Sequence, residues 1–168
     1  IISITNNQSL INNTPVNYLV LMVGSGLVLG DSTVATYAGG TQIASFIYTE
    51  EQINDGWQVT NIAVPGHTIA QQKAVYLSTA SRSTVDFTIS QIGLNDMNPA
   101  EASSVAIARL QDLINTINSN KKIGALTIIS TMIPCRQRYI DVYGATNGPI
   151  AWQKFLEINE AIKGYGPN

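Results

Sequence analysis

The chain has 168 residues, the length of one ordinary domain, with no room for a second. Hydrophobic residues make up 45% and the net charge is only -2, so the chain can bury a core and is not disordered. One cysteine and one histidine exclude an internal disulfide and any site that needs two histidines of this chain.

The charge pattern argues against two classes of partner. Basic and acidic residues number 9 and 11, and only Lys121 and Lys122 form an adjacent basic pair, so we expect no nucleic-acid partner. The longest apolar run, residues 18–23, is too short to cross a bilayer, so we expect no membrane partner. Asn, Ser and Thr replace many of the usual charges, a composition typical of extracellular and virion proteins. We therefore expect an extracellular or virion-associated protein.

Apolar runs and turn signals predict strands that alternate with helices. Residues 1–17 are polar and are predicted to be a linker or an edge segment, followed by a domain over 18–168. The strands are expected at 18–23, 27–30, 57–64, 84–92 and 124–131, with a glycine-rich break at 24–26 between the first two. The helices are expected at 43–53, 69–78, 99–117 and 152–163.

Capping residues place two of these helices. Thr68 and Gln71 fit a capping box, and Asn98-Pro99 supplies a cap with proline at the first helical position. The stretch 134–149 is predicted to be a polar loop, and Gly164 to end the last helix. The helix after Asn98 carries one apolar face: Ala106, Leu110, Leu113, Ile114 and Ile117.

Alternation of strands and helices predicts an α/β domain with a parallel sheet and helices on both faces. In such sheets the functional loops follow the carboxyl ends of the strands. Three short segments occupy these places: 30–33 (Gly-Asp-Ser-Thr), 61–66 (Asn-Ile-Ala-Val-Pro-Gly) and 93–96 (Gly-Leu-Asn-Asp). We refer to them as segments I, II and III.

Segments I to III, in this order, resemble blocks I, II and III of the SGNH (GDSL-type) esterase and lipase family. The resemblance extends over about residues 19–163. It implies a three-layer α/β/α flavodoxin-like fold and a serine nucleophile at Ser32. It also implies an oxyanion hole formed by the Ser32 and Gly66 backbone N–H groups and the Asn95 amide.

The chemistry of ester hydrolysis agrees with these roles. A serine hydroxyl attacks an acyl carbon only when a base takes its proton, and it is best exposed on a tight turn at a strand end. The oxyanion that forms needs preorganised donors, which a backbone N–H at a glycine and a side-chain amide can supply. No cofactor is expected, and no metal site either, because the single His and Cys are far apart without clustered carboxylates.

Each of these residues also has a structural interpretation. Ser32 could cap a helix, Gly66 could be a turn glycine, and Asn95 and Asp96 could form a turn. Asp31 is expected to accept local N–H bonds, and Asp96 to order its own loop, although both remain candidates for the pocket.

Residues 135–138 follow the last predicted strand. Cys135 is expected to be an inert buried thiol. Arg136 and Arg138 are expected in a solvated loop, with substrate contact as the alternative.

The family's catalytic histidine lies in a D-x-x-H segment that has no match here. The only histidine is His67, beside Gly66. We expect the last strand and the D-x-x-H segment to belong to a continuation, a cleaved partner or a second chain. The alternatives are a fold that has lost activity and His67 acting as the base from an unusual place.

The leading hypothesis is an SGNH-type esterase that removes acyl groups from a small ester, with O-acetyl groups of a polysaccharide as the expected substrate. A secreted enzyme or a phage tail-spike component would fit this expectation. The alternative is a non-catalytic carbohydrate-binding or structural module on the same fold. A nucleotide-binding domain is disfavoured because no G-x-G-x-x-G or P-loop follows the first strand.

Overall fold

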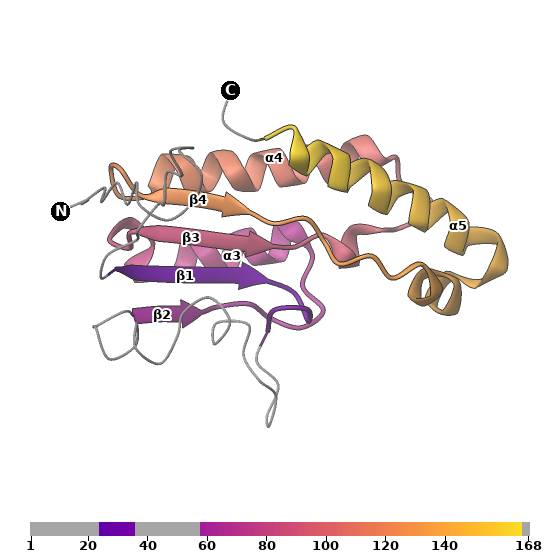
Figure 1. The fold of residues 1–168 in the computed structure, drawn as a ribbon, viewed down its shortest axis with the longest axis horizontal. Helices are drawn as coiled ribbons and strands as arrows, with labels where there is room; N and C mark the ends of the chain where they lie inside the picture. Colours follow the sequence, from indigo (N-terminus) through magenta and orange to yellow (C-terminus); the bar gives the residue numbers. More distant parts are fainter. Residues whose placement is uncertain (1–23, 36–57, 166–168) are drawn as a thin grey trace, which may run out of the picture.

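The computed structural model describes residues 24–35 and 58–165, and its described strands form one parallel sheet (Figure 1). The strands are β1 (Ser25–Gly30), β2 (Gln58–Asn61), β3 (Phe87–Gln91) and β4 (Leu126–Ile129), in the order β2-β1-β3-β4. The helices are α3 (Ile69–Ser78), α4 (Ser103–Asn120) and α5 (Arg136–Lys163), with short 3-10 turns η1 (Ala80–Ser83) and η2 (Leu94–Asp96). The strand predicted at 18–23, the helix at 43–53 and the polar segment 1–17 lie outside the described residues.

The strand order explains where α3 and α4 lie. The chain moves from β2 to β3 through α3 and from β3 to β4 through α4, in the same direction across the sheet. Right-handed crossovers put such helices on one face, and both lie behind the sheet in Figure 1. They pack against each other, and α5 packs against α4. The predicted α/β class with a parallel sheet is confirmed.

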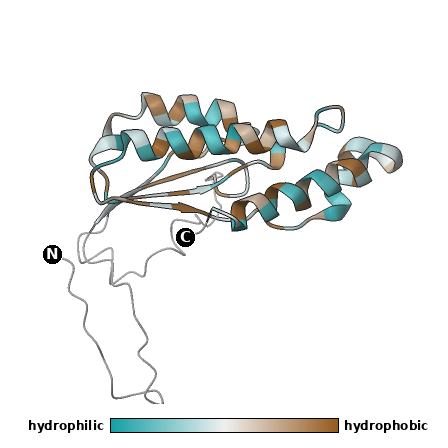
Figure 2. Ribbon diagram, turned by 90° about the horizontal axis from the view of Figure 1, so that it is seen from above, coloured by the Kyte–Doolittle hydropathy of each residue, from teal (hydrophilic) through white to brown (hydrophobic). Residues whose placement is uncertain are grey.

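The main core lies between β1, β3 and these helices. Leu27 and Leu29 of β1 are completely buried. The apolar face predicted for α4 is also buried. Figure 2 colours the helices by hydropathy and shows apolar and polar residues alternating along them. Among the described residues, no helix is both long and apolar enough to span a bilayer.

The predicted break at 24–26 is wrong, because Ser25 and Gly26 belong to β1. The Ser25 N–H donates to Asp86 Oδ2 at 2.9 Å, just before β3. A Cβ at Gly26 would overlap the Phe87 ring on the neighbouring strand. The glycine here therefore makes room for an aromatic side chain and does not interrupt the strand.

The two capping predictions had different outcomes. The Thr68–Gln71 capping box is present at the start of α3, and the helix ends at Ser78 as predicted. The cap at Asn98 is wrong, because α4 begins only at Ser103. The Asn98 side chain instead accepts the Ala100 N–H at 3.1 Å, which closes a local turn.

The predicted loop at 134–149 is also wrong, because α5 runs from Arg136 to Lys163 with a kink at Gly144 (φ 77°). The two halves pack closely: a Cβ at Gly148 would be 2.6 Å from the Ile140 Cα. Tyr139 of the first half contacts Trp152 and Phe155 of the second, with ring centroids 6.1 and 5.7 Å apart. The polar sequence is helical because this pairing buries one aromatic face.

The helix also changes the setting of residues 135–138. Cys135, which was expected to be buried, is exposed at the N-cap position of α5. Arg136 and Arg138 belong to the first turn of the helix instead of a loop, and both are exposed. Gly164 is the C-cap of α5, as predicted.

Tyr139→Phe is expected to raise the free energy of unfolding by about 1 kcal/mol. The Tyr139 hydroxyl is buried and has no hydrogen-bond partner within 24–35 and 58–165, and burial raises the pKa of this phenol well above its usual value. An unpaired buried hydroxyl costs about 1–3 kcal/mol, which phenylalanine avoids. Urea unfolding measures the change. The matched control is Tyr76→Phe, which loses a buried hydroxyl that donates to the Ile117 carbonyl at 3.5 Å and should lower stability. A loss of stability in Tyr139→Phe would contradict the prediction.

Candidate active site

Segments I, II and III lie at the same edge of the sheet, as parallel strands require. Gly30, the last residue of β1, is in register with Gln91 at the end of β3. On the other side of β1, the Val64 N–H donates to the Gly30 carbonyl at 3.1 Å, which continues the pairing beyond β2. The Asp31–Ser32 turn is therefore flanked by segment II on one side and segment III on the other.

Asp31 organises the turn that carries Ser32. Its Oδ1 accepts the Thr33 N–H at 2.9 Å and the Thr33 hydroxyl at 2.8 Å. Its carbonyl accepts the Ala35 N–H at 2.9 Å, which closes one helical turn. Asp31 is only 1% exposed, whereas Ser32 is half-buried. The structural role expected for Asp31 is thus present, and Ser32 retains access to solvent.

Gln91 connects this turn to the end of β4. Its Oε1 is 3.2 Å from the Thr33 hydroxyl, and its Nε2 donates to the Thr131 carbonyl at 2.9 Å. The Gln91 amide thus links the turn that carries Ser32 to the segment that follows β4.

Segment II is held by Asn61 and ends in an open glycine turn. Asn61 Nδ2 donates to the Val34 carbonyl at 2.7 Å, and its Oδ1 accepts the Ala63 N–H at 3.0 Å. Gly66 has φ +79° and is exposed, and apart from its chain neighbours no atom of the described residues lies within 4 Å of where a Cβ would be. The turn interpretation of Gly66 holds, and the exposed glycine leaves space on the side where a Cβ would lie.

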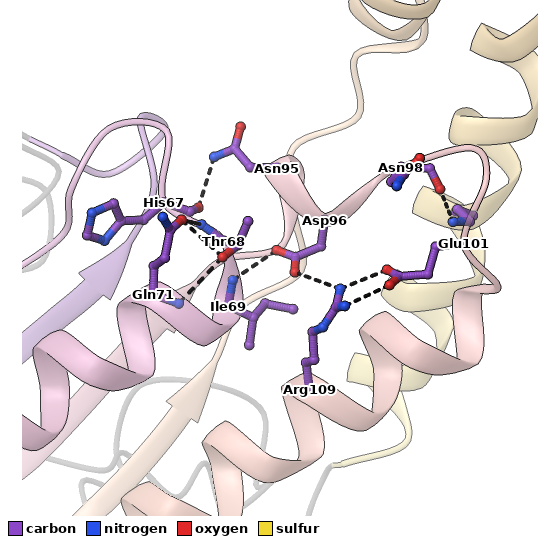
Figure 3. Close-up of polar contacts among 10 residues, drawn as sticks. His67, Thr68, Ile69, Gln71, Asn95, Asp96, Asn98, Glu101 and Arg109 are labelled. Atoms are coloured by element: carbon purple, nitrogen blue, oxygen red, sulfur yellow. Dashed lines mark hydrogen bonds and ion pairs between the residues drawn. The ribbon is translucent and has the colours of Figure 1, made fainter.

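Asn95 reaches from segment III toward segment II. Its Nδ2 donates to the His67 carbonyl at 3.0 Å, and the side chain is half-buried (Figure 3). An amide nitrogen carries two hydrogens, so this bond fixes the group and leaves a second N–H. The contact brings Asn95 next to the Gly66–His67 turn.

His67 is placed beside the oxyanion-hole candidates, but its ring is not oriented by them. The imidazole points away from Asn95 and Asp96 (Figure 3). Its Nδ1 is buried, and within the described part of the chain it has no hydrogen-bond partner. A catalytic histidine normally has its second nitrogen oriented by another group. This geometry therefore does not favour His67 as the base.

Asp96 differs from the expectation that it orders its own loop. Its Oδ2 accepts the Ile69 N–H of α3 at 2.9 Å, and its Oδ1 lies 3.6 Å from Arg109 Nη1 of α4 (Figure 3). Arg109 in turn holds Glu101 with two bonds of 2.7 Å. Burial raises the pKa of Asp96, and the Ile69 N–H and Arg109 oppose that shift. Arg109 was not singled out from the sequence, and Glu101 was expected only as the glutamate at the third position of the helix after Asn98, whereas α4 begins at Ser103.

Groups of three or more His, Cys, Asp and Glu side chains that could hold a metal do not occur within 24–35 and 58–165.

Comparisons with known proteins give the fold. No family model matches the chain, and no curated protein matches it in sequence. A GDSL-family lipolytic protein from Veillonella parvula matches with 17% identity and a TM-score of 0.57, over 84% of this chain and 71% of that protein. The psychrotrophic esterase EstA from Pseudoalteromonas sp., inhibited by monoethylphosphonate, matches with 16% identity and a TM-score of 0.53, over 83% and 73%.

A lipase/acylhydrolase from Enterococcus faecalis matches with 18% identity and a TM-score of 0.56, over 83% of this chain and 73% of that protein. At these identities the likeness is one of fold. The chain has the flavodoxin-like α/β fold of the GDSL/SGNH hydrolases, as its sequence resemblance implied.

Proposed function

We propose that the protein is a serine esterase of the SGNH type. The observation that carries this proposal is the arrangement at one sheet edge: Ser32 on a buried Asp31 turn, Gly66 on the neighbouring open turn, and Asn95 bonded to the His67 carbonyl. The esterases and acylhydrolases that share the fold support a small ester as the substrate.

The proposed reaction proceeds through an acyl-enzyme. The Ser32 oxygen attacks the acyl carbon while a base takes the hydroxyl proton, and the carbonyl electron pair moves onto oxygen. The Ser32 and Gly66 N–H groups and the Asn95 amide donate to this oxyanion. When the carbonyl re-forms, the alkoxide leaves with the proton from the base. Water repeats the sequence and releases the acid and free Ser32.

The proposed base is a histidine that these 168 residues do not contain, supplied by a further chain segment or a second chain. His67 Nδ1 has no hydrogen-bond partner among the residues that the structure describes, which supports an external base over His67 itself. We also propose that the natural substrate carries O-acetyl groups on a polysaccharide, encountered outside the cell or at a virion surface. Release of acetate from acetylated polysaccharide, compared with long-chain acyl esters, tests that substrate.

A labelling experiment tests the proposed nucleophile and base together. A fluorescent alkyl phosphonate should react with the protein, and peptide mapping by mass spectrometry should place the adduct on Ser32. His67→Gln should react at a rate within threefold of the original protein and should hydrolyse p-nitrophenyl acetate similarly. Loss of both reactions in His67→Gln would make His67 the base. No labelling and no p-nitrophenol release by the unsubstituted protein, assayed together with the segment or chain that supplies the histidine, would favour the non-catalytic binding module.

A further inference from the structure

Two neighbouring residues of η2 are bonded to two alternate residues at the start of α3. Asn95 Nδ2 donates to the His67 carbonyl at 3.0 Å, and Asp96 Oδ2 accepts the Ile69 N–H at 2.9 Å (Figure 3). The pair forms a clamp between segments II and III. We define this clamp as the two hydrogen bonds Asn95–His67 and Asp96–Ile69.

We infer that Asp96 is a positioning residue that sets the distance between Gly66 and Asn95 by fixing the start of α3 on η2. The inference rests on the proposed function, because Gly66 and Asn95 are the proposed oxyanion donors. Asp96 itself does not touch the substrate: its side chain is fully buried.

The Asp96–Ile69 bond is not needed to cap α3. The helix already has a complete local cap, in which Thr68 Oγ1 accepts the Gln71 N–H and the Gln71 side chain accepts the Thr68 N–H. Asp96 takes the N–H of Ile69, the first helical residue, which that box leaves unpaired. Its contribution is therefore a tertiary bond, which ties the helix end to the turn that carries Asn95.

Burial of Asp96 makes its charged carboxylate form unfavourable in free energy. Asp96 is 2% exposed, and burial raises its pKa, with Glu101 and Asp31 adding to the shift. The raised pKa means that folding favours the protonated form, so stability from this group declines as pH rises through that pKa. Arg109 and the start of α3 offset part of the cost. Glu101 holds Arg109 in place with its two bonds.

This arrangement has a functional consequence. Oxyanion donors work only when they are held at the position where charge develops, and a displacement of about 1 Å can cost about 100-fold in rate. Without the Asp96 bond, Asn95–His67 is the remaining clamp bond between η2 and the Gly66–His67 turn. Removing the Asp96 bond should therefore weaken stabilisation of the transition state, which lowers kcat, and should leave substrate binding unchanged.

The test uses Asp96→Ala and Asp96→Asn in the whole protein with p-nitrophenyl acetate. Asp96→Ala should lower kcat by about 10–100-fold with KM within twofold, because it displaces donors that act on the oxyanion only in the transition state. Asp96→Asn retains an oxygen that can accept the Ile69 N–H and should recover most of kcat. The control is Asp112→Ala, which removes an exposed carboxylate paired with Lys73 on the same two helices and should leave kcat within twofold.

The outcomes separate this inference from the proposed function. Full kcat in folded Asp96→Ala, in a protein that hydrolyses the ester, overturns the inference alone. An equal loss in Asp96→Ala and Asp96→Asn overturns it too, because the retained acceptor should rescue. An inactive unsubstituted protein overturns both. If Asp96→Ala does not fold, Asp96→Ser takes its place, because its shorter side chain also loses the acceptor at that distance.

Discussion

Ser32→Ala is expected to lower kcat/KM for p-nitrophenyl acetate by at least about 10⁴-fold. Alanine has no oxygen to attack the acyl carbon, so the acyl-enzyme cannot form. The turn should stay intact, because its bonds come from Asp31 and Thr33 and not from the Ser32 side chain. The variant should keep the unfolding midpoint of the original protein, and steady-state kinetics measures the loss.

The matched control for this substitution is Ser119→Ala. Ser119 is an exposed serine on α4, away from the carboxyl edge of the sheet, and its replacement should leave kcat/KM unchanged. A Ser32→Ala protein that keeps more than about a tenth of the activity would remove Ser32 as the nucleophile. An equal loss of kcat/KM in both variants would indicate that the preparation or assay, and not the change at Ser32, lowers the activity.

Gly30→Ala is expected to reduce both stability and activity. A Cβ at Gly30 would overlap Val34 Cγ2 and lie 2.5 Å from the Gln91 carbonyl oxygen. The carbonyl belongs to β3 and cannot move without disturbing the sheet, so we expect a loss of about 2–3 kcal/mol. In a domain of this size that loss corresponds to a drop of about 5–10 °C in Tm. Val34 packs inside the Asp31 turn, so its displacement should also misplace Ser32.

Gly24→Ala is the control at the other end of the same strand. There a Cβ would lie 3.3 Å from Asp86 Oδ2, a side-chain atom that can move slightly. Calorimetry should show a change in Tm of less than about 2 °C for Gly24→Ala, and the esterase assay no loss. An unchanged Tm in Gly30→Ala would mean that the turn is looser than the contacts of Gly30 imply.

Local signals predicted the parts of the fold that local interactions decide. The Thr68–Gln71 capping box is a contact between residues three apart, and it correctly predicted the start of α3. The spacing of apolar residues gave the buried face of α4 because a helix presents every third or fourth residue to the core. The order of strands and helices was sufficient to predict the parallel sheet.

The predictions that failed depended on distant contacts. Gly26 looked like a break because the Phe87 ring that covers it is 61 residues further along the chain. The polar stretch before Pro149 looked like a loop because the packing of Tyr139 on Trp152 and Phe155 only exists once the helix folds back at Gly144.

The candidate site shows the same division. The motif residues Ser32, Gly66 and Asn95 could be selected from the sequence and do follow strand ends. The bond from Asp96 to Ile69 and its pairing with Arg109 could not be, because they join three elements whose spacing carries no motif. A sequence motif identifies the groups that react, whereas the groups that hold them come from the packing.

The position of β1 in the sheet has a consequence for how the protein would lose activity. β1 is paired on both sides, with β2 and with β3, and the turn that carries Ser32 continues directly from it. Segments that open by local unfolding are usually those with few neighbours, such as edges and termini. The strand that supports Ser32 should therefore be among the last parts to open. On heating, inactivation at Ser32 should coincide with global unfolding of the domain and not precede it.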